Sequence, residues 1–156
     1  YKDGKIFFCH GYNINGVMLQ LSDDLKSVSV VWRTDVLDTH HGGYVEVNGT
    51  IYGSNWINNN QGNWCAIDWN TGAKGYETTW TGGKGKGSII AADGMLYCYD
   101  ERRGAVALVN PDPAKFDIVS EFRITKGVGP HWAHPVIVNG VLYIRHGFAL
   151  MAYKVK

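Results

Sequence analysis

Asn48-Gly49-Thr50-Ile51-Tyr52 is one of four copies of a short pattern that occurs at almost equal intervals along this chain of 156 residues. The other copies are Asp3-Gly4-Lys5-Ile6-Phe7, Asp93-Gly94-Met95-Leu96-Tyr97 and Asn139-Gly140-Val141-Leu142-Tyr143. Their glycines are separated by 45, 45 and 46 residues. A fixed period of this size predicts similar structural units that stack and bury each other's apolar faces.

Each copy predicts a β-hairpin. An Asx-Gly pair suits the two central positions of a type I′ turn, where φ is positive, and the flanking residues are β-branched or aromatic. Two further apolar runs follow the hairpin, so the second unit is expected to hold strands at 43–47, 50–54, 64–69 and 75–80. No stretch has a helical period with capping residues. Four short strands in about 45 residues are typical of a propeller blade.

The predicted fold class is therefore all-β, a partial β-propeller of about four incomplete four-stranded antiparallel blades. We expect a single domain over 1–156, with approximate blades at 1–36, 37–81, 82–126 and 127–156. The first blade lacks the strand before its turn, and the last lacks a fourth strand. The sequence thus predicts a C-terminal part of a longer protein, whose partners are the remaining blades or another copy of the chain. Open strand edges favour such pairing.

The composition excludes some classes of partner. Lys and Arg number 15 and Asp and Glu 14, so the formal net charge is +1, and no basic run is longer than Arg102-Arg103. A nucleic-acid or anionic-membrane partner has no electrostatic basis here. The longest uncharged stretch, 47–67, is too rich in Asn and Gly to cross a bilayer. The odd set of Cys9, Cys65 and Cys98, without a C-x-x-C pair, predicts buried free thiols.

The segment Ala66-Ile67-Asp68-Trp69-Asn70-Thr71-Gly72, followed by Trp80, resembles the A-x-D-x-x-T-G…W pattern of PQQ-like repeats in quinoprotein alcohol dehydrogenase-like propellers. The stretch 135–146 is similar to the last blade of bacterial proteins of this group. The resemblance implies that Asp68, Thr71 and Gly72 form a hairpin and that Trp80 docks between blades. Trp32 and Phe122 are aligned with Trp80 in two other units. An exported protein, periplasmic or at the cell surface, is also implied.

For the dehydrogenases of this group, the resemblance implies PQQ across the channel, a bridging calcium ion, an Asp base and often an adjacent pair of cysteines. This chain has no adjacent cysteines, and only Asp38 lies near the recurrent channel positions. No cofactor is therefore expected in this fragment, PQQ with calcium remains the alternative, and no catalytic residue is assigned.

The best candidate site comes from aligning the units by their turn glycines. Residues six to nine positions before the glycine precede the first strand, which is innermost in a propeller, so they surround one mouth of the channel. Imidazole and ammonium groups donate hydrogen bonds and indole stacks. The predicted ligand-binding residues are His40, His41, Lys86, His131, Trp132 and His134. Solvated loops that only join blades are the simpler alternative, and no metal site is predicted because no adjacent carboxylate supports one.

The leading functional hypothesis is a non-catalytic scaffold that binds a protein or a small ligand, such as a carbohydrate or an anion, at this mouth. The alternatives are a quinone-dependent alcohol or sugar dehydrogenase, and a carbohydrate-binding or glycan-processing module that uses Trp132 and the Asn-rich loop 56–64. The Gly-rich stretch 82–88 is interpreted as a flexible connection between blades, because a phosphate-binding loop needs a helix after it.

Overall fold

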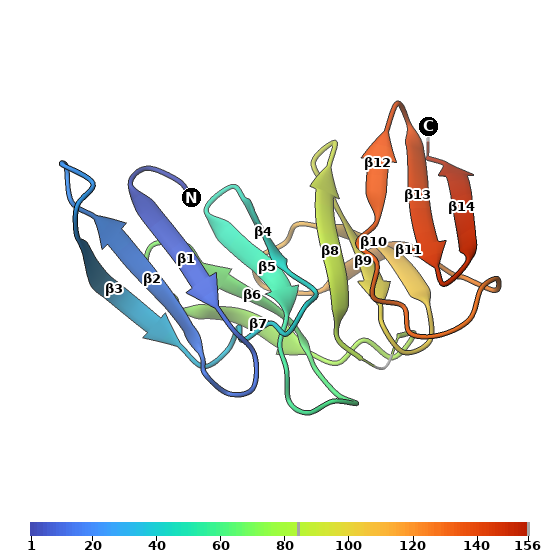
Figure 1. The fold of residues 1–156 in the computed structure, drawn as a ribbon, viewed down its shortest axis with the longest axis horizontal. Coiled ribbons are helices and arrows are strands. Elements are labelled where there is room, and N and C mark those ends of the chain that lie inside the picture. The colour runs from blue at the N-terminus through green and yellow to red at the C-terminus, as the bar shows by residue number, and fades with distance from the viewer. Residues whose placement is uncertain (84, 156) are drawn as a thin grey trace.

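All regular secondary structure in the described part of this protein is β-strand. The computed structural model describes residues 1–83 and 85–155, and Figure 1 shows their strands in chain order. The strands are β1 (Lys5–Cys9), β2 (Gly16–Leu21), β3 (Val28–Thr34), β4 (Tyr44–Val47), β5 (Thr50–Ser54), β6 (Trp64–Asp68), β7 (Lys74–Thr78), β8 (Gly87–Ala92), β9 (Met95–Asp100), β10 (Ala105–Asn110), β11 (Asp117–Arg123), β12 (Val136–Val138), β13 (Val141–His146) and β14 (Ala149–Lys154). A helix that could cross a membrane is absent from the described residues.

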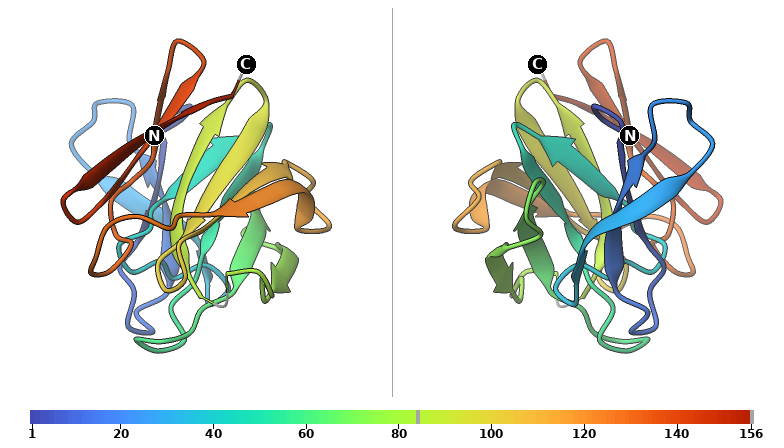
Figure 2. Two further views of the ribbon diagram at one scale, coloured as in Figure 1. Left: turned by 90° about the vertical axis from the view of Figure 1, so that its right-hand side faces the viewer. Right: turned by 90° about the vertical axis from the view of Figure 1, so that its left-hand side faces the viewer.

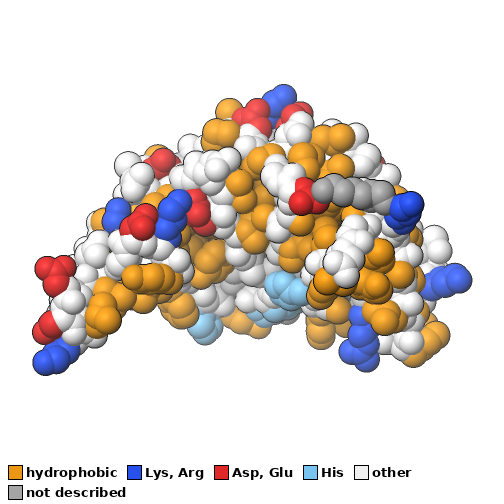
Figure 3. Space-filling model, turned by 90° about the horizontal axis from the view of Figure 1, so that it is seen from above, with side chains coloured by type: hydrophobic (Ala, Val, Ile, Leu, Met, Phe, Trp, Pro, Cys, Tyr) orange, Lys and Arg blue, Asp and Glu red, His pale blue; other side chains and the backbone are white. Residues whose placement is uncertain are grey.

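The strands form four antiparallel sheets, each made of consecutive strands. Their orders are β1-β2-β3, β4-β5-β6-β7, β8-β9-β10-β11 and β12-β13-β14. The side views show that successive sheets are rotated relative to one another (Figure 2). Seen from above, the molecule is an arch with a concave inner edge (Figure 3). The arrangement is a partial β-propeller, which confirms the fold class predicted from the repeat.

Three of the four Asx-Gly pairs form the turns that join the first and second strands of their sheets, and Asp3-Gly4 forms the turn before β1, where Lys2 and Lys5 make an isolated bridge. In the pair Asn48-Gly49, φ is 51° and 83°, and the other three pairs also have two positive φ values. This is the type I′ geometry that suits the twist of an antiparallel hairpin. The even spacing of the four turns along the sequence therefore matches the succession of four sheets along the chain.

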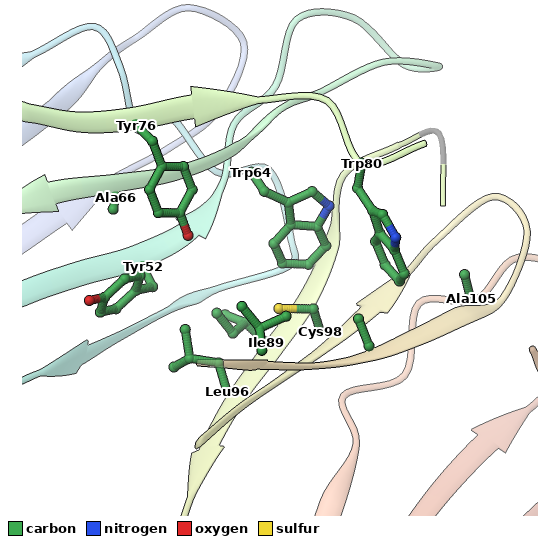
Figure 4. Close-up of a cluster of buried hydrophobic side chains, with 11 residues drawn as sticks. Tyr52, Trp64, Ala66, Tyr76, Trp80, Ile89, Leu96, Cys98 and Ala105 are labelled. Carbon is green, nitrogen blue, oxygen red and sulfur yellow. The ribbon is translucent and has the colours of Figure 1, made fainter. Parts of the chain in front are cut away.

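An inner sheet packs one of its faces against the preceding sheet and the other face against the following sheet. Because successive side chains alternate between faces, Ile51 and Ile67 pack toward the first sheet, while Tyr52 and Trp64 pack toward the third. Figure 4 shows the latter side chains above Ile89, Leu96 and Cys98 of the third sheet. A third cluster lies between the third and fourth sheets. The cores therefore lie between blades.

Gly42, before β4, and Gly87, the first residue of β8, allow the second and third sheets to approach closely. A Cβ atom at Gly42 would overlap the backbone carbonyl of Gly87, and the Ser54 hydroxyl donates to the same carbonyl at 3.0 Å. Gly87 thus serves close packing in β8, where the sequence predicted a flexible connection over 82–88. Lys84, within that stretch, lies outside the described residues.

The three cysteines have free thiols, as predicted. Cys65 and Cys98 are buried, and Cys9 is partly buried. Burial raises the pKa of Cys9 to about 11, with a smaller opposing effect from a backbone hydrogen bond. The Cys9 thiol is therefore largely protonated at neutral pH and is a poor nucleophile.

Candidate functional site

The predicted mouth residues lie at the end of the blades opposite the Asx-Gly turns. This end, at the lower edge of Figure 1, carries the β1–β2, β5–β6 and β9–β10 loops and the segments that enter β4, β8 and β12. Figure 3 shows histidine side chains along the concave inner edge of the arch. The loop end therefore gathers segments that are distant in the sequence.

A buried ion pair lies at the centre of the loop end. Lys86 Nζ is 2.7 Å from Glu101 Oε1, and the two side chains are only 4% and 6% exposed. Lys86 Nζ also donates to the carbonyl oxygens of Asn58 at 3.0 Å and Asn59 at 3.1 Å. These three contacts use the donors of the ammonium group. Lys86, predicted to contact a ligand, thus joins the β5–β6 loop to the β9–β10 loop.

His41 connects this ion pair to the surface. Its Nε2 atom is 3.0 Å from Glu101 Oε2, and its Nδ1 atom has no hydrogen-bond partner among the described residues. Burial lowers the pKa of His41, and the Glu101 carboxylate opposes this effect. His134 Nε2 lies 3.0 Å from the His41 carbonyl oxygen. The contact brings the segment before β12 against the segment before β4.

Five rings follow one another across the loop end, and we call this row the aromatic ladder. It is formed by Trp56, Tyr12, His40, His41 and Trp132, with successive centroid separations of 4.9, 4.8, 4.7 and 5.2 Å. His40 Nε2 and the Tyr12 hydroxyl are also 2.7 Å apart. Trp132 is 57% exposed and Tyr12 is 50% exposed. The ladder thus presents aromatic surface to solvent.

The loops that carry the ladder are linked through Asp38. This side chain is 3% exposed, and its Oδ1 atom accepts a hydrogen bond from the Gly11 amide at 2.7 Å. The Asp38 carbonyl oxygen accepts a second bond from the Trp56 amide at 2.9 Å. Asp38 therefore fixes the β1–β2 and β5–β6 loops relative to each other. The Oδ2 atom of Asp38 is buried and has no hydrogen-bond partner among the described residues.

His131 lies beneath the surface instead of on it. It is 8% exposed, its Nδ1 atom is 2.5 Å from the Tyr99 hydroxyl, and its ring stacks on His146 at 3.7 Å. The two nitrogens of His146 lie 2.8 and 2.7 Å from the carbonyl oxygens of Lys126 and Gly129. The two imidazoles thereby hold the segment that leads to Trp132.

His131 should make the stability of the protein depend on pH. Burial lowers the pKa of His131 from 6.5 to about 4, and His146 acts in the same direction. The unfolded chain therefore binds a proton at higher pH than the folded chain, so the stability that neutral His131 contributes is lost as pH falls from 6.5 to about 4. We expect the urea midpoint to fall over this range, and to fall less in His131→Gln. Equal pH profiles for the two proteins would contradict this.

The residues assigned to blade docking occupy two places. Asp68 Oδ1 accepts hydrogen bonds from the amides of Asn70 at 2.9 Å and Thr71 at 2.8 Å, and from the Thr71 hydroxyl at 2.8 Å. These bonds lower the pKa of Asp68, and the bond from the Thr71 hydroxyl has the largest effect. Gly72 has a φ of 72°, and a Cβ atom there would lie 2.6 Å from the Trp32 ring. The β6–β7 turn therefore packs on the first sheet.

Trp80 lies beyond the end of β7. It is 2% exposed, and its Nε1 atom donates to Glu121 Oε2 in the third sheet at 2.9 Å. The strand registers pair Met18 with Trp32 and Ala66 with Tyr76, so Tyr76, and not Trp80, takes the position of Trp32. The prediction that Trp80 is equivalent to Trp32 was therefore wrong. Register shifts within the outer strand pairs obscure this equivalence in the sequence.

Three residues of the candidate site had no signal in the turn-based alignment. Tyr12 and Glu101 lie in loops after the second strand, whereas the alignment considered only the segments before the first. Trp56 belongs to a long loop, and the sequence gives no further sign of its place in the site. Comparison of the loops after β1, β5 and β9 could have found them, although their residues differ in type.

Comparisons with known proteins identify the fold. No protein-family profile matches the chain, and no curated protein matches it. The structure is similar to the crystal structure of BamB from Moraxella catarrhalis, with a TM-score of 0.62 and 14% sequence identity. The match covers 94% of this chain and 48% of the BamB chain. The chain thus spans about half the length of that propeller, and the likeness concerns the fold alone.

Proposed function

We propose that this chain is a non-catalytic binding scaffold and that its aromatic ladder contacts a protein partner. The observation that carries this proposal is the continuous row of five rings, in which Trp132 and Tyr12 remain at least half exposed. Trp and Tyr dominate the centres of protein interfaces because they offer a large apolar area and a polar group at a small entropic cost.

The support beneath the ladder favours binding by a preformed surface. Lys86, Glu101 and Asp38 are buried and connect the loops that carry the rings. A surface that is already ordered loses less conformational entropy when a partner binds. Glu101 also offsets the charge of Lys86, so recognition would rest on ring contacts and imidazole hydrogen bonds.

The experiment is a selection of displayed peptides on the immobilised protein, followed by calorimetry with the selected peptide. Trp132→Ala should weaken binding about 30-fold, which corresponds to about 2 kcal/mol. Its stability should change by less than about 0.5 kcal/mol because the side chain is exposed. Tyr1→Ala, at an 81% exposed aromatic outside the ladder, is the control and should bind normally. Failure to select any peptide, or equal binding by Trp132→Ala, would contradict the proposal.

Carbohydrate binding is the second candidate, on the basis of a different surface. A hollow of about 540 Å³ beside the Asn-rich loop is lined by Ile57, Gln61, Gly62, Asn63, Thr79 and Thr81. Amide and hydroxyl groups match the hydrogen-bonding needs of sugars. A glycan array should then give a signal that Thr81→Val reduces and Trp132→Ala leaves unchanged. An array without any signal would remove this candidate.

The residues at the loop end do not fit a calcium-bridged quinone. Among the described residues, no three His, Cys, Asp or Glu side chains are grouped so that they could hold a metal ion. One Asp38 oxygen already accepts a backbone hydrogen bond, and Glu101 is engaged by Lys86 and His41. We therefore derive no catalytic step for this chain.

We also propose a protein family, a cellular location and partners for this chain. The Asp68-Thr71-Gly72 turn supports membership of the PQQ-like repeat proteins, and that resemblance favours an exported bacterial protein. Further blades of a longer protein, or another copy of the chain, are the proposed partners of the outermost sheets.

A further inference from the structure

The exposed charges of this protein differ in sign between the two ends of the blades. Because the strands are antiparallel, the β2–β3 and β10–β11 connections lie at the same end as the Asx-Gly turns. The acidic residues of these turns and connections are Asp3, Asp23, Asp24, Asp93 and Asp112, and the basic residues are Lys2, Lys26 and Lys115. This end is therefore mainly acidic, although the formal net charge of the whole chain is +1.

At the loop end, the carboxylates near the aromatic ladder are buried. Asp38, Asp100 and Glu101 are 3%, 0% and 7% exposed. In the described segments that join strands at this end, Asp35 is the one exposed acidic residue, and it lines a hollow between the first two sheets that also includes Arg33. Little negative charge is therefore exposed around the ladder.

Exposed cations remain beside one end of the ladder, and we call them the basic rim. They are Arg102 and Arg103 in the β9–β10 loop and Lys126 in the segment after β11. Arg102 Nη1 donates to the carbonyl oxygen of Asn60 at 2.9 Å. The side chains of Arg103 and Lys126 form neither a hydrogen bond nor an ion pair with another described residue. The rim therefore holds positive charge that the described chain leaves unpaired.

Backbone hydrogen bonds place the basic rim next to Trp132. The Ile124 amide donates to the Gly104 carbonyl oxygen at 2.8 Å, and the His131 amide donates to the Glu101 carbonyl oxygen at 3.2 Å. These two bonds hold segment 124–131 along the β9–β10 loop, which carries both arginines, and Trp132 follows this segment directly. The cations and the exposed end of the ladder thus belong to one surface.

This surface also offers apolar area. Trp132 is 57% exposed, and Val128, two residues after Lys126, is 63% exposed. The Trp132 ring meets the His41 ring at an angle of 62° and a centroid separation of 5.2 Å. Because this edge contact uses only part of the indole, a side chain of a partner can pack on the remainder.

The combination of free cations and an exposed indole fits an acidic polypeptide. Guanidinium groups bind carboxylates through paired hydrogen bonds, and complementary charge accelerates association. Nucleic acids and anionic membranes are the less favoured occupants, because they are bound by longer basic stretches or larger basic patches. Here the rim has three cations, and one of them already contacts Asn60. An acidic segment with an apolar side chain uses both the charge and the ring.

We infer that the basic rim selects an acidic segment of a protein partner, in which carboxylates flank an apolar side chain that packs on Trp132. The inference rests on the proposed function of the aromatic ladder and adds the chemistry of the partner. Ion pairs at an exposed rim are screened by salt, whereas apolar ring contacts are not. Binding of such a segment should therefore weaken as the salt concentration rises.

The probe is a labelled peptide, capped at both ends, with a tryptophan between two runs of aspartate. We expect saturable binding by fluorescence anisotropy, with a dissociation constant that rises at least about fivefold between about 0.05 M and about 0.5 M NaCl. The same peptide with asparagine in place of aspartate should bind at least about tenfold more weakly. Equal binding of the two peptides would overturn the inference.

A double variant tests the basic rim. Arg103→Gln with Lys126→Gln should weaken binding of the aspartate peptide at least about tenfold and leave binding of the asparagine peptide unchanged. The matched control is Lys26→Gln with Lys115→Gln, which makes the same change in net charge at the opposite end. All four positions are exposed, so the urea midpoints should stay close to that of the unchanged protein. Equal weakening by the two double variants would show that only net charge matters and would contradict the inference.

Trp132→Ala separates this inference from the proposed function. If Trp132→Ala weakens both peptides and the double variant at the rim weakens neither, the ladder binds polypeptides without selecting acidic ones, and only the inference fails. If Trp132→Ala leaves both peptides unaffected, the ladder is not the binding surface and the proposed function fails as well.

Other sources of negative charge are tested directly. Vesicles of phosphatidylcholine and phosphatidylglycerol, or a single-stranded oligonucleotide, should not displace the labelled aspartate peptide at equal charge concentration. Sedimentation should show no association of the protein with itself that Asp23→Asn with Asp24→Asn abolishes. Displacement by vesicles or by the oligonucleotide, or such self-association, would assign the rim to a different occupant and overturn the inference.

Discussion

Replacement of Trp64 by Ala should lower the free energy of unfolding by about 3–5 kcal/mol. Trp64 is 1% exposed and lies between the second and third sheets, where it contacts Trp80 and Phe116. Its Nε1 atom donates to the Gly85 carbonyl oxygen at 3.1 Å. The substitution removes a large apolar contact, leaves a cavity and deprives a buried carbonyl of its donor. Urea denaturation followed by circular dichroism measures the change.

Trp132→Ala provides the matched control for this experiment. The same residue type is removed, but Trp132 is 57% exposed and leaves no internal cavity. Its expected effect on stability is below about 0.5 kcal/mol. If the two variants were equally stable, the packing between sheets would not be the main source of stability, and the blade arrangement would need revision.

Lys86→Met should have an effect of similar size, about 3–5 kcal/mol, because it leaves Glu101 buried without its cation. Lys86 and Glu101 are 4% and 6% exposed, so water cannot replace the lost partner easily. The double variant Lys86→Met with Glu101→Gln should recover much of the loss, since it removes both charges. A double-mutant cycle of unfolding free energies measures the coupling.

The control is a surface ion pair. Lys115 and Asp117 lie 3.1 Å apart, but their side chains are 63% and 34% exposed. Exposed pairs typically contribute less than about 1 kcal/mol. Lys115→Met should therefore have little effect. Additive losses at Lys86 and Glu101, or a coupling no larger than that of the surface pair, would show that burial does not strengthen their interaction.

The positions of the candidate site residues were predictable from the repeat, but their roles were not. His40, His41, Lys86, His131, Trp132 and His134 precede the first strands, and equivalent segments of successive blades lie at one end. Whether each of these side chains is buried depends on which residues of neighbouring loops pack against it. The β5–β6 and β9–β10 loops enclose Lys86, and His146 covers His131, whereas Trp132 stays 57% exposed.

The sequence by itself determined the hairpins and their spacing, because a turn with positive φ and an alternation of period two depend on residues that are neighbours in the chain. The tertiary structure alone decided which polar groups became buried and which rings formed the aromatic ladder. These outcomes depend on the contact of Tyr12 with His40 and on the contacts of His41 with Glu101 and Trp132, which join different blades or the segments between them. Such contacts require the sheets to be arranged around a common axis, and no local pattern encodes them.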